Sequence, residues 1–345
     1  MIKLRPEIIT GIRSASTPEE LGYYLQNAIE LEHSTIPPYL TAMLSFRTGT
    51  NVDIAAQIRE IVIEEMLHMT IASNILIAIG GSPVINKPDF IPHYPGPLPM
   101  NIGDLTVGIE TFSIELVKNT FMAIEEPENP IPVETPEALA APEYATIGQF
   151  YDAIKEQIKA LGPSIFVKPT APPQVVDSTW FGPRLFVITD PDTACAAIDL
   201  IKIEGEGTSD SPFQRPGSPA HYYRFGEIVA GRRLIKTADG FAYGGAPILF
   251  DPSGVWPLRP NCKIADFAPG TQARTRIEAF AYNYSSLLNA LHNTFNGAPE
   301  QLDTAIGVMY DLRVLAVSLM ETDIGDNTGQ TVGPSYEYVD SEGGM

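Results

Sequence analysis

Cysteine is scarce in this sequence: Cys195 and Cys262 are the two cysteines among its 345 residues. Two thiols cannot form the disulfide framework of a small secreted protein, so we expect a reducing, cytoplasmic location. Apolar runs are short as well, and none reaches the roughly 18 residues that a membrane span needs. Residues 1–16 interrupt their apolar stretches with charged side chains and lack the core of a secretory signal. We expect no membrane partner.

Basic residues are also few. The chain has 22 Lys and Arg against 42 Asp and Glu, a formal charge of −20. Because phosphate binding needs a basic patch, this excess of acidic residues argues against a nucleic-acid partner. An acidic surface keeps a protein soluble and is also compatible with attracting cations. The sequence contains no Gly-rich phosphate loop and no credible nucleophile–His–Asp set.

Two long helices are predicted near the N-terminus. Thr17 and Pro18 form a helix start, and apolar residues then recur with helical spacing until the turn at Gly49. A second helix is predicted over 52–79, where a glycine pair followed by proline stops it. Because a short turn joins the two helices, they are expected to form an antiparallel hairpin.

The remaining sequence alternates between irregular segments and shorter helical patterns. Residues 83–192 are rich in proline and too long for a plain loop, so we interpret them as an insertion packed on a helix bundle formed by residues 1–230. Residues 231–322 are interpreted as a C-terminal extension packed on the bundle, and the acidic, Gly-rich residues 323–345 as a disordered tail. The further helices predicted are 114–126, 147–161, 193–204, one from about 219, 271–295 and 299–321. The segment 234–268 is predicted to form hairpins and loops.

Three polar residues occupy positions where the two long helices should be apolar. Glu32 falls on the apolar stripe of the first helix, and Glu65 and His68 both fall on that of the second. Burying a carboxylate costs several kcal/mol unless something pairs with it, and few cationic side chains share these stripes. A metal ion would compensate. By contrast, Glu30, Glu60 and Glu64 lie off the stripes and are expected to be solvated.

Glu65 and His68 form a Glu-x-x-His pair, in which both side chains project from one helix face. Together with a glutamate from the neighbouring helix, such a pair makes half of a carboxylate-bridged di-iron or di-manganese site. Imidazole and carboxylate ligands suit iron, manganese or zinc. The alternative is a buried, hydrogen-bonded Glu–His pair without a metal.

A second half-site is less complete in the sequence. Glu204 continues the apolar stripe of its helix, Glu206 lies just beyond it, and His221 begins the next helix. These residues could supply a carboxylate and an imidazole to a second ion. The usual pattern has a glutamate three residues before the histidine, where this chain has Ser218. The missing ligand could come instead from Glu125 or Glu227.

Several short motifs, taken together, resemble a known family, the ferritin-like family of iminophenyl-pyruvate dimer synthase domains. The motifs are Glu32–Leu40, Glu65–Met69, Gly80–Pro83, Tyr94–Pro99, Phe121–Glu128, Gly205–Thr208 and His221–Phe225. The resemblance implies a mainly α fold, namely a ferritin-like helix bundle, here with the long Pro-rich insertion and extra C-terminal helices. It also implies oxidative coupling of amino-acid-derived imines in bisindole pigment pathways, with iron, including haem, as cofactor. Members of those pathways are much longer than this chain, so the fold and the metal ligands Glu32, Glu65 and His68 are what the resemblance carries over.

The sequence therefore predicts an iron-dependent, non-haem oxidoreductase with one or two ions, which acts on a small amino-acid-derived molecule in specialised metabolism. The predicted metal ligands are Glu32, Glu65, His68, Glu204, Glu206 and His221. The expected partners are a small-molecule substrate, dioxygen and a second copy of the chain in a homodimer. The alternative is a non-enzymatic metal-binding or storage protein, or a ferritin-like scaffold that has lost its chemistry.

Overall fold

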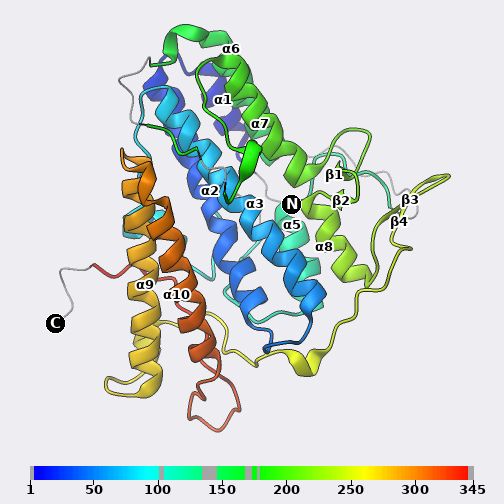
Figure 1. Ribbon diagram of the computed structural model, residues 1–345, viewed down its shortest axis with the longest axis vertical. Helices are drawn as coiled ribbons and strands as arrows, with labels where there is room; N and C mark the ends of the chain where they lie inside the picture. The colour runs from blue at the N-terminus through cyan, green and yellow to red at the C-terminus, as the bar shows by residue number, and fades with distance from the viewer. Residues whose placement is uncertain (1–3, 101–104, 134–145, 168–172, 177–178, 341–345) are drawn as a thin grey trace.

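A pair of long antiparallel helices, α2 (Pro18–Leu44) and α3 (Val52–Ala78), forms the centre of the molecule (Figure 1). The computed structural model describes residues 4–100, 105–133, 146–167, 173–176 and 179–340. The hairpin predicted from the sequence is confirmed. Thr17 caps α2, since its side chain accepts a hydrogen bond from the backbone N–H of Glu20. After α3 the chain turns at Gly80, whose φ of 90° favours glycine.

Shorter helices pack against one face of this pair. The helix α7 contacts α3, α6 and α8, and α6 contacts α2. The predicted helix 114–126 is present, but its middle is π-helical, so that it reads as three consecutive elements. These surrounding helices are α4 (Ile114–Leu116), the π turn η2 (Val117–Phe121), α5 (Met122–Glu125), α6 (Ile147–Leu161), α7 (Pro191–Glu206) and α8 (His221–Ala230).

The two C-terminal helices, α9 (Gln272–Phe295) and α10 (Leu302–Met320), form a second antiparallel pair beside α2 and α3 (Figure 1). Both lie close to their predicted bounds. The intervening segment 234–268 contains the predicted hairpin, with β3 (Ile235–Thr237) paired to β4 (Gly240–Ala242). A second small hairpin pairs β1 (Phe213–Arg215) with β2 (Ser218–Pro219). The 3-10 turns are η1 (Pro88–Phe90), η3 (Pro163–Ile165), η4 (Gly182–Arg184), η5 (Pro252–Gly254), η6 (Ile264–Asp266) and η7 (Pro299–Gln301).

Three features differ from the sequence prediction. The helix α1 (Pro6–Ser14) was not predicted, and its contact with α6 explains why such a short helix is stable. The helix α7 does not break at Gly205 but continues to Glu206 and ends at Gly207, whose φ of 83° favours glycine. The predicted disordered tail is wrong for residues 331–336, which are all buried. Residues 341–345 lie outside the described part of the chain.

The apolar character of α3 is that of a core helix. By length and composition it could cross a membrane, but 89% of its most apolar window is buried inside the protein. Cys195 and Cys262 are both buried and free.

Tyr336 ties the C-terminal segment to the core, and its removal should destabilise the fold. Its ring packs edge-on against Phe280 and Tyr284, and its hydroxyl lies 3.0 Å from that of Thr41. Because a large buried aromatic is lost, we expect Tyr336→Ala to lower the free energy of unfolding by about 3–5 kcal/mol. Tyr336→Phe removes the hydrogen bond alone and should cost about 1 kcal/mol. Urea unfolding of both variants tests this, and equal, small losses would contradict the packing role.

Candidate metal centre

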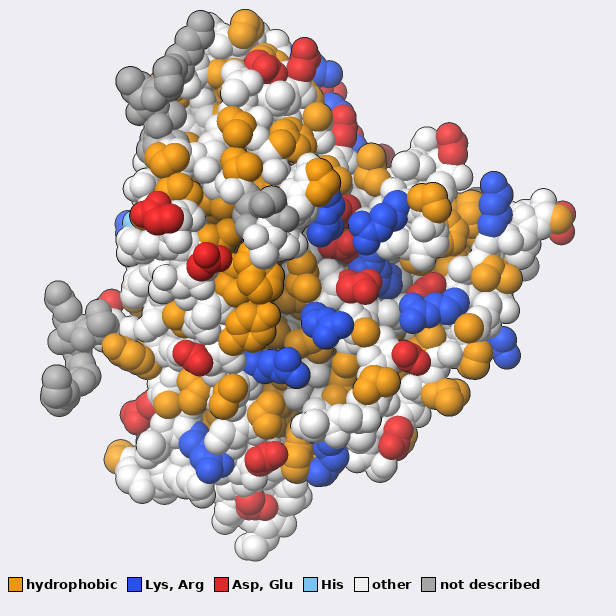
Figure 2. All heavy atoms as spheres, viewed as in Figure 1, with side chains coloured by type: hydrophobic (Ala, Val, Ile, Leu, Met, Phe, Trp, Pro, Cys, Tyr) orange, Lys and Arg blue, Asp and Glu red, His pale blue; other side chains and the backbone are white. Residues whose placement is uncertain are grey.

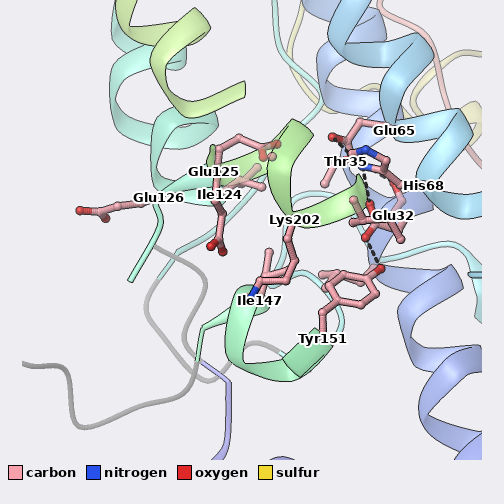
Figure 3. A pocket seen from close by; sticks show the side chains of 15 residues that line it. Glu32, Thr35, Glu65, His68, Ile124, Glu125, Glu126, Ile147, Tyr151 and Lys202 are labelled. Atoms are coloured by element: carbon pink, nitrogen blue, oxygen red, sulfur yellow. Dashed lines mark hydrogen bonds and ion pairs between the residues drawn. The ribbon is translucent and has the colours of Figure 1, made fainter. Parts of the chain in front are cut away.

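The interior between α2, α3, α5 and α8 holds a cluster of carboxylates and imidazoles. Glu32, Glu65 and His68 each offer a ligand atom, and these three atoms lie within 4.8 Å of one another. Figure 3 shows the three side chains pointing toward one another from α2 and α3. All three are buried, with 2–5% of each residue exposed. These are the three polar residues that the sequence placed on the apolar faces of the two long helices.

A second group shares one carboxylate with the first. Glu65, Glu125 and His221 also offer ligand atoms within 4.8 Å of one another. His221 Nδ1 lies 2.8 Å from Glu65 Oε1 and 3.6 Å from Glu125 Oε2. Each group thus consists of its own glutamate, its own histidine and the common Glu65. This is the ligand arrangement of a two-ion site with a bridging carboxylate.

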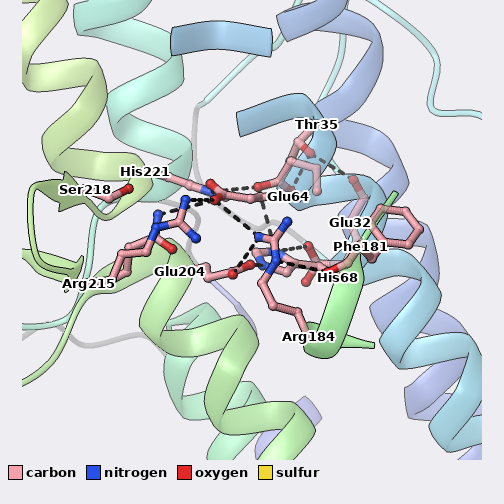
Figure 4. Close-up of polar contacts among 12 residues, drawn as sticks. Glu32, Thr35, Glu64, His68, Phe181, Arg184, Glu204, Arg215, Ser218 and His221 are labelled. Atoms are coloured by element: carbon pink, nitrogen blue, oxygen red, sulfur yellow. Dashed lines mark hydrogen bonds and ion pairs between the residues drawn. The ribbon is translucent and has the colours of Figure 1, made fainter. Parts of the chain in front are cut away.

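The outer nitrogen of each histidine contacts a further carboxylate. His68 Nε2 lies 3.0 Å from Glu204, and His221 Nε2 lies 3.0 Å from Glu64 (Figure 4). Burial alone would raise the pKa of Glu64, but the hydrogen bond and charge of His221, together with the charge of Arg224, outweigh burial and lower this pKa to about 2. The pKa of Glu204 is likewise lowered against burial by the hydrogen bond and charge of His68 and by a hydrogen bond from Arg184. An ionised carboxylate can only accept, so Nε2 donates in both pairs. In the neutral ring, the lone pair is then on Nδ1, which faces the cluster.

Arginines complete this outer layer. Arg184 Nη1 lies 2.9 Å from Glu204 Oε1, and Arg224 Nη1 lies 3.0 Å from Glu64 Oε2. The two histidines therefore sit in parallel arrangements, each backed by a carboxylate and an arginine. The outer carboxylates are paired with arginines, whereas no arginine or lysine pairs with Glu32, Glu65 or Glu125 among the described residues.

Hydroxyl groups orient the inner carboxylates. Thr35 donates to Glu65 Oε2 at 2.8 Å, Tyr39 donates to Glu125 Oε1 at 2.6 Å, and Tyr151 donates to Glu32. Each of these bonds occupies one carboxylate oxygen. The other oxygen of each carboxylate is left to face the centre of the cluster.

The electrostatics of the cluster favour a cation. Burial raises the pKa of Glu65, and the negative charge of Glu125 adds to the effect, so that this pKa reaches about 7. Burial alone would lower the pKa of His68, but its carboxylate partners outweigh burial and raise it to about 10. Both shifts show an interior with an excess of negative charge, which a divalent ion would neutralise.

One atom fits a metal better than it fits the protein. His221 Nδ1 is buried and makes no hydrogen bond of acceptable geometry within the described residues, although two carboxylates approach it. Atoms that converge without bonding to one another are arranged as ligands around a common point. The ligand set of nitrogen and oxygen atoms suits iron, manganese or zinc.

The remaining predicted ligands lie near the cluster but outside both groups. Glu204 contacts the outer nitrogen of His68, away from the inner carboxylates. Glu206 lines the same small cavity of about 40 Å³ as Glu32 and Glu65, and burial raises its pKa to about 7. Its carboxylate packs on Gly148, where a Cβ atom would come within 2.6 Å of Oε2. That Glu204 and Glu206 bind a metal ion remains a prediction.

Some other residues have partners that differ from those predicted from the sequence. Glu64 was expected to be solvated, but it is 3% exposed and pairs with His221 and Arg224. Glu227, an alternative second-site ligand, instead bonds Gln57 and Arg233. Glu125, the other alternative, is the one that enters the second group, while Glu126 points away (Figure 3). Five residues that contact the cluster were not predicted from the sequence, namely Thr35, Tyr39, Tyr151, Arg184 and Arg224.

The comparisons with known proteins agree with this architecture. The chain matches the family described as Ferritin-like over residues 25–230. It is similar to dichlorochromopyrrolate synthase of Lentzea aerocolonigenes, with 23% identity over 309 residues that cover 79% of this chain and 29% of the relative. The chain thus spans less than a third of that protein's length. Among solved structures it is similar to a ferritin-like protein from Caulobacter vibrioides, with a TM-score of 0.63, 22% identity, and coverage of 92% of this chain and 97% of the other.

The outer carboxylate of His68 should influence metal affinity without binding the metal. We expect Glu204→Gln to weaken metal binding by about tenfold to a hundredfold, because the amide cannot fix and polarise the imidazole as the carboxylate does. Asp192→Asn, an exposed change in the first turn of the same helix, is the matched control. Competition with a chromogenic chelator measures both affinities. Complete loss of one ion in Glu204→Gln would instead identify Glu204 as a ligand.

Proposed function

This chain belongs to the ferritin-like family, and on that premise we propose that it is an iron-dependent, non-haem oxidoreductase acting on a small, amino-acid-derived molecule. The observation that carries the proposal is the pair of ligand groups that share Glu65. A single ion or a buried Glu–His pair would need only one such group. Two groups joined by one carboxylate are typical of oxidative di-iron sites in helix bundles.

We propose that Glu32, Glu65 and His68 hold one ion and that Glu125, Glu65 and His221 hold the other. Bound iron would supply redox chemistry with dioxygen. Manganese or zinc would fit the same ligands, and the family resemblance gives haem as an alternative cofactor.

The protein's own contribution is to keep these ligands in position. Thr35, Tyr39 and Tyr151 fix the carboxylates, and Glu64 and Glu204 hold the histidine protons on Nε2. The surrounding core is apolar and keeps bulk water away from the cluster. The cavity of about 40 Å³ that reaches Glu32 and Glu65 has room for ions and molecules of the size of water or dioxygen.

The substrate class is the part of the proposal that rests on relatives. The similar protein from Lentzea aerocolonigenes is named as a synthase of dichlorochromopyrrolate, and the motif resemblance implies coupling of amino-acid-derived imines. We propose substrates of that chemical class, whereas the activity of the whole, longer relative does not carry over.

Iron content tests the two-ion arrangement. We expect about two iron ions per chain in the wild type after anaerobic loading, about one in Glu125→Ala, and none bound tightly in Glu65→Ala, because Glu65 serves both groups. Glu126→Ala is the control, because this carboxylate lines the same cavity but points away from the cluster, and it should retain both ions. Elemental analysis and Mössbauer spectra count and characterise the iron, and an optical spectrum separates it from haem.

Oxygen consumption tests the oxidoreductase. The iron-loaded protein should consume dioxygen faster when an amino acid or imine of the right class is added, and Glu65→Ala should not. If no such compound elicits iron-dependent oxygen consumption, the proposal fails. Many iron ions per chain in a large multi-subunit shell would favour the storage alternative.

A further inference from the structure

The central helix pair has a second face, opposite the candidate metal centre. On α2, Glu32 points to the metal ligands, while the next residue, His33, lines a separate cavity between α2, α3, α9 and α10. On α3, His68 likewise faces the candidate metal centre, and the next residue, Met69, lines the separate cavity. This cavity has a volume of about 250 Å³. It is several times larger than the cavity at the metal ligands, and it is close to the lower end of the range for small-molecule pockets.

The cavity is long and almost entirely apolar. Its lining residues run over 33–44 on α2, 59–70 on α3 and 302–313 on α10. Eleven residue steps along a helix correspond to about 17 Å. Four of the chain's nine methionines, Met43, Met66, Met69 and Met309, line it. Methionine is flexible and polarizable, and it suits surfaces that must adapt to an apolar ligand.

The cavity opens to the surface. Ile63, Trp180 and Tyr310 belong to its lining and are 36%, 40% and 52% exposed. Figure 2 shows hydrophobic side chains gathered where α3 faces α10, with basic side chains beside the lower part of this band. An apolar opening of this kind indicates a binding site, because a soluble protein otherwise covers such surface.

The residues that line the cavity include basic side chains and no acidic ones. Arg59 and Arg313 line it, and none of its lining residues is acidic, although the whole chain has a formal charge of −20. The side chain of neither arginine forms an ion pair or hydrogen bond with the described residues, unlike those of Arg184 and Arg224. Two unpaired cations in an acidic protein are suited to an anionic group on a ligand.

Both arginines lie toward the same end of the cavity. Arg59 is the first lining residue of α3, and Arg313 is the last lining residue of α10. The helices α3 and α10 run in opposite directions (Figure 1), which brings these two positions to one end. His33, the first lining residue of α2, lies toward the other end of the cavity and is hydrogen-bonded to Tyr284.

We propose that this cavity binds one free alkyl carboxylate of medium chain length, with the chain between the two helix pairs and the carboxylate at Arg59 and Arg313. The length, the aliphatic lining and the charge at one end each match a part of such a molecule. The site is separate from the proposed metal centre and does not depend on the function proposed for it.

Calorimetric titration of the full-length protein with dodecanoate, below its micelle concentration, tests the site. We expect one molecule per chain, and binding of decanoate weaker by roughly tenfold, because two CH₂ groups fewer are buried. Dodecyltrimethylammonium, which has a positive head group, should bind far more weakly than dodecanoate. Equal binding of the two head groups, or no saturable binding of dodecanoate, overturns the proposal.

Substitutions separate the two parts of the site. The double variant Arg59→Gln and Arg313→Gln should weaken dodecanoate binding by about three- to tenfold, as expected for partly exposed charge pairs. Lys236→Gln, which removes one positive charge on the exposed strand β3, is the control and should leave binding unchanged. Ala305→Trp should fill the cavity and abolish binding, and Met309→Trp serves the same purpose if Ala305→Trp does not fold.

Further measurements distinguish other occupants. Iron content should be unchanged in the arginine variants, so that a failure of this site is distinguishable from a failure of the metal centre.

Sedimentation velocity tests whether a second copy of the chain covers the cavity. A wild-type dimer that dissociates in Ala305→Trp, together with no binding of dodecanoate, contradicts the proposal. Binding only to phosphatidylglycerol vesicles, and not to free dodecanoate, contradicts it as well.

Discussion

The packing of three carboxylates, two of them buried and Glu125 nearly so, around two buried imidazoles is the constraint on which the architecture depends. Glu32, Glu65 and Glu125 lie in an interior that raises the pKa of Glu65 to about 7 and that of His68 to about 10. Such a cluster is costly in an apolar core unless positive charge compensates it. Arginines pair with the outer carboxylates Glu64 and Glu204, and within the described part of the chain none pairs with the inner three. Compensation of the inner charge is what an ion at the shared carboxylate would provide.

Much of the fold and half of the candidate site could be predicted from the sequence. The helices α2 and α3 have strong periodicity and clear end signals, so that a polar residue on their stripes, such as Glu32 or His68, stands out. The C-terminal pair was predictable for the same reason. The bundle is confirmed by the match to the ferritin-like family and by a TM-score of 0.63 to a ferritin-like structure.

The other half of the site depends on features that periodicity does not reveal. Glu125 follows the π turn η2, in which the i→i+5 hydrogen bonding shifts the side chains downstream relative to a regular helix. Glu125 faces the cluster and Glu126 does not, whereas the sequence had left Glu125 and Glu227 as the alternatives. Glu64 was misjudged because its compensating partner Arg224 is 160 positions away in the chain and meets it only through the packing of α8. The buried tail was missed because a polar, Gly-rich composition does not show that Val332 and Tyr336 reach the core.

The two faces of the central hairpin impose opposite demands on the same helices. A helix turns 100° per residue, so adjacent residues such as Glu32 and His33, or His68 and Met69, must serve different neighbours. One face needs rigid, hydrogen-bonded polar groups, since ligand geometry tolerates little displacement. The other face uses flexible side chains such as Met66 and leaves space between the helix pairs. Because α2 and α3 separate the two faces, no candidate metal ligand lines the second cavity, and the two candidate sites can be altered by separate substitutions.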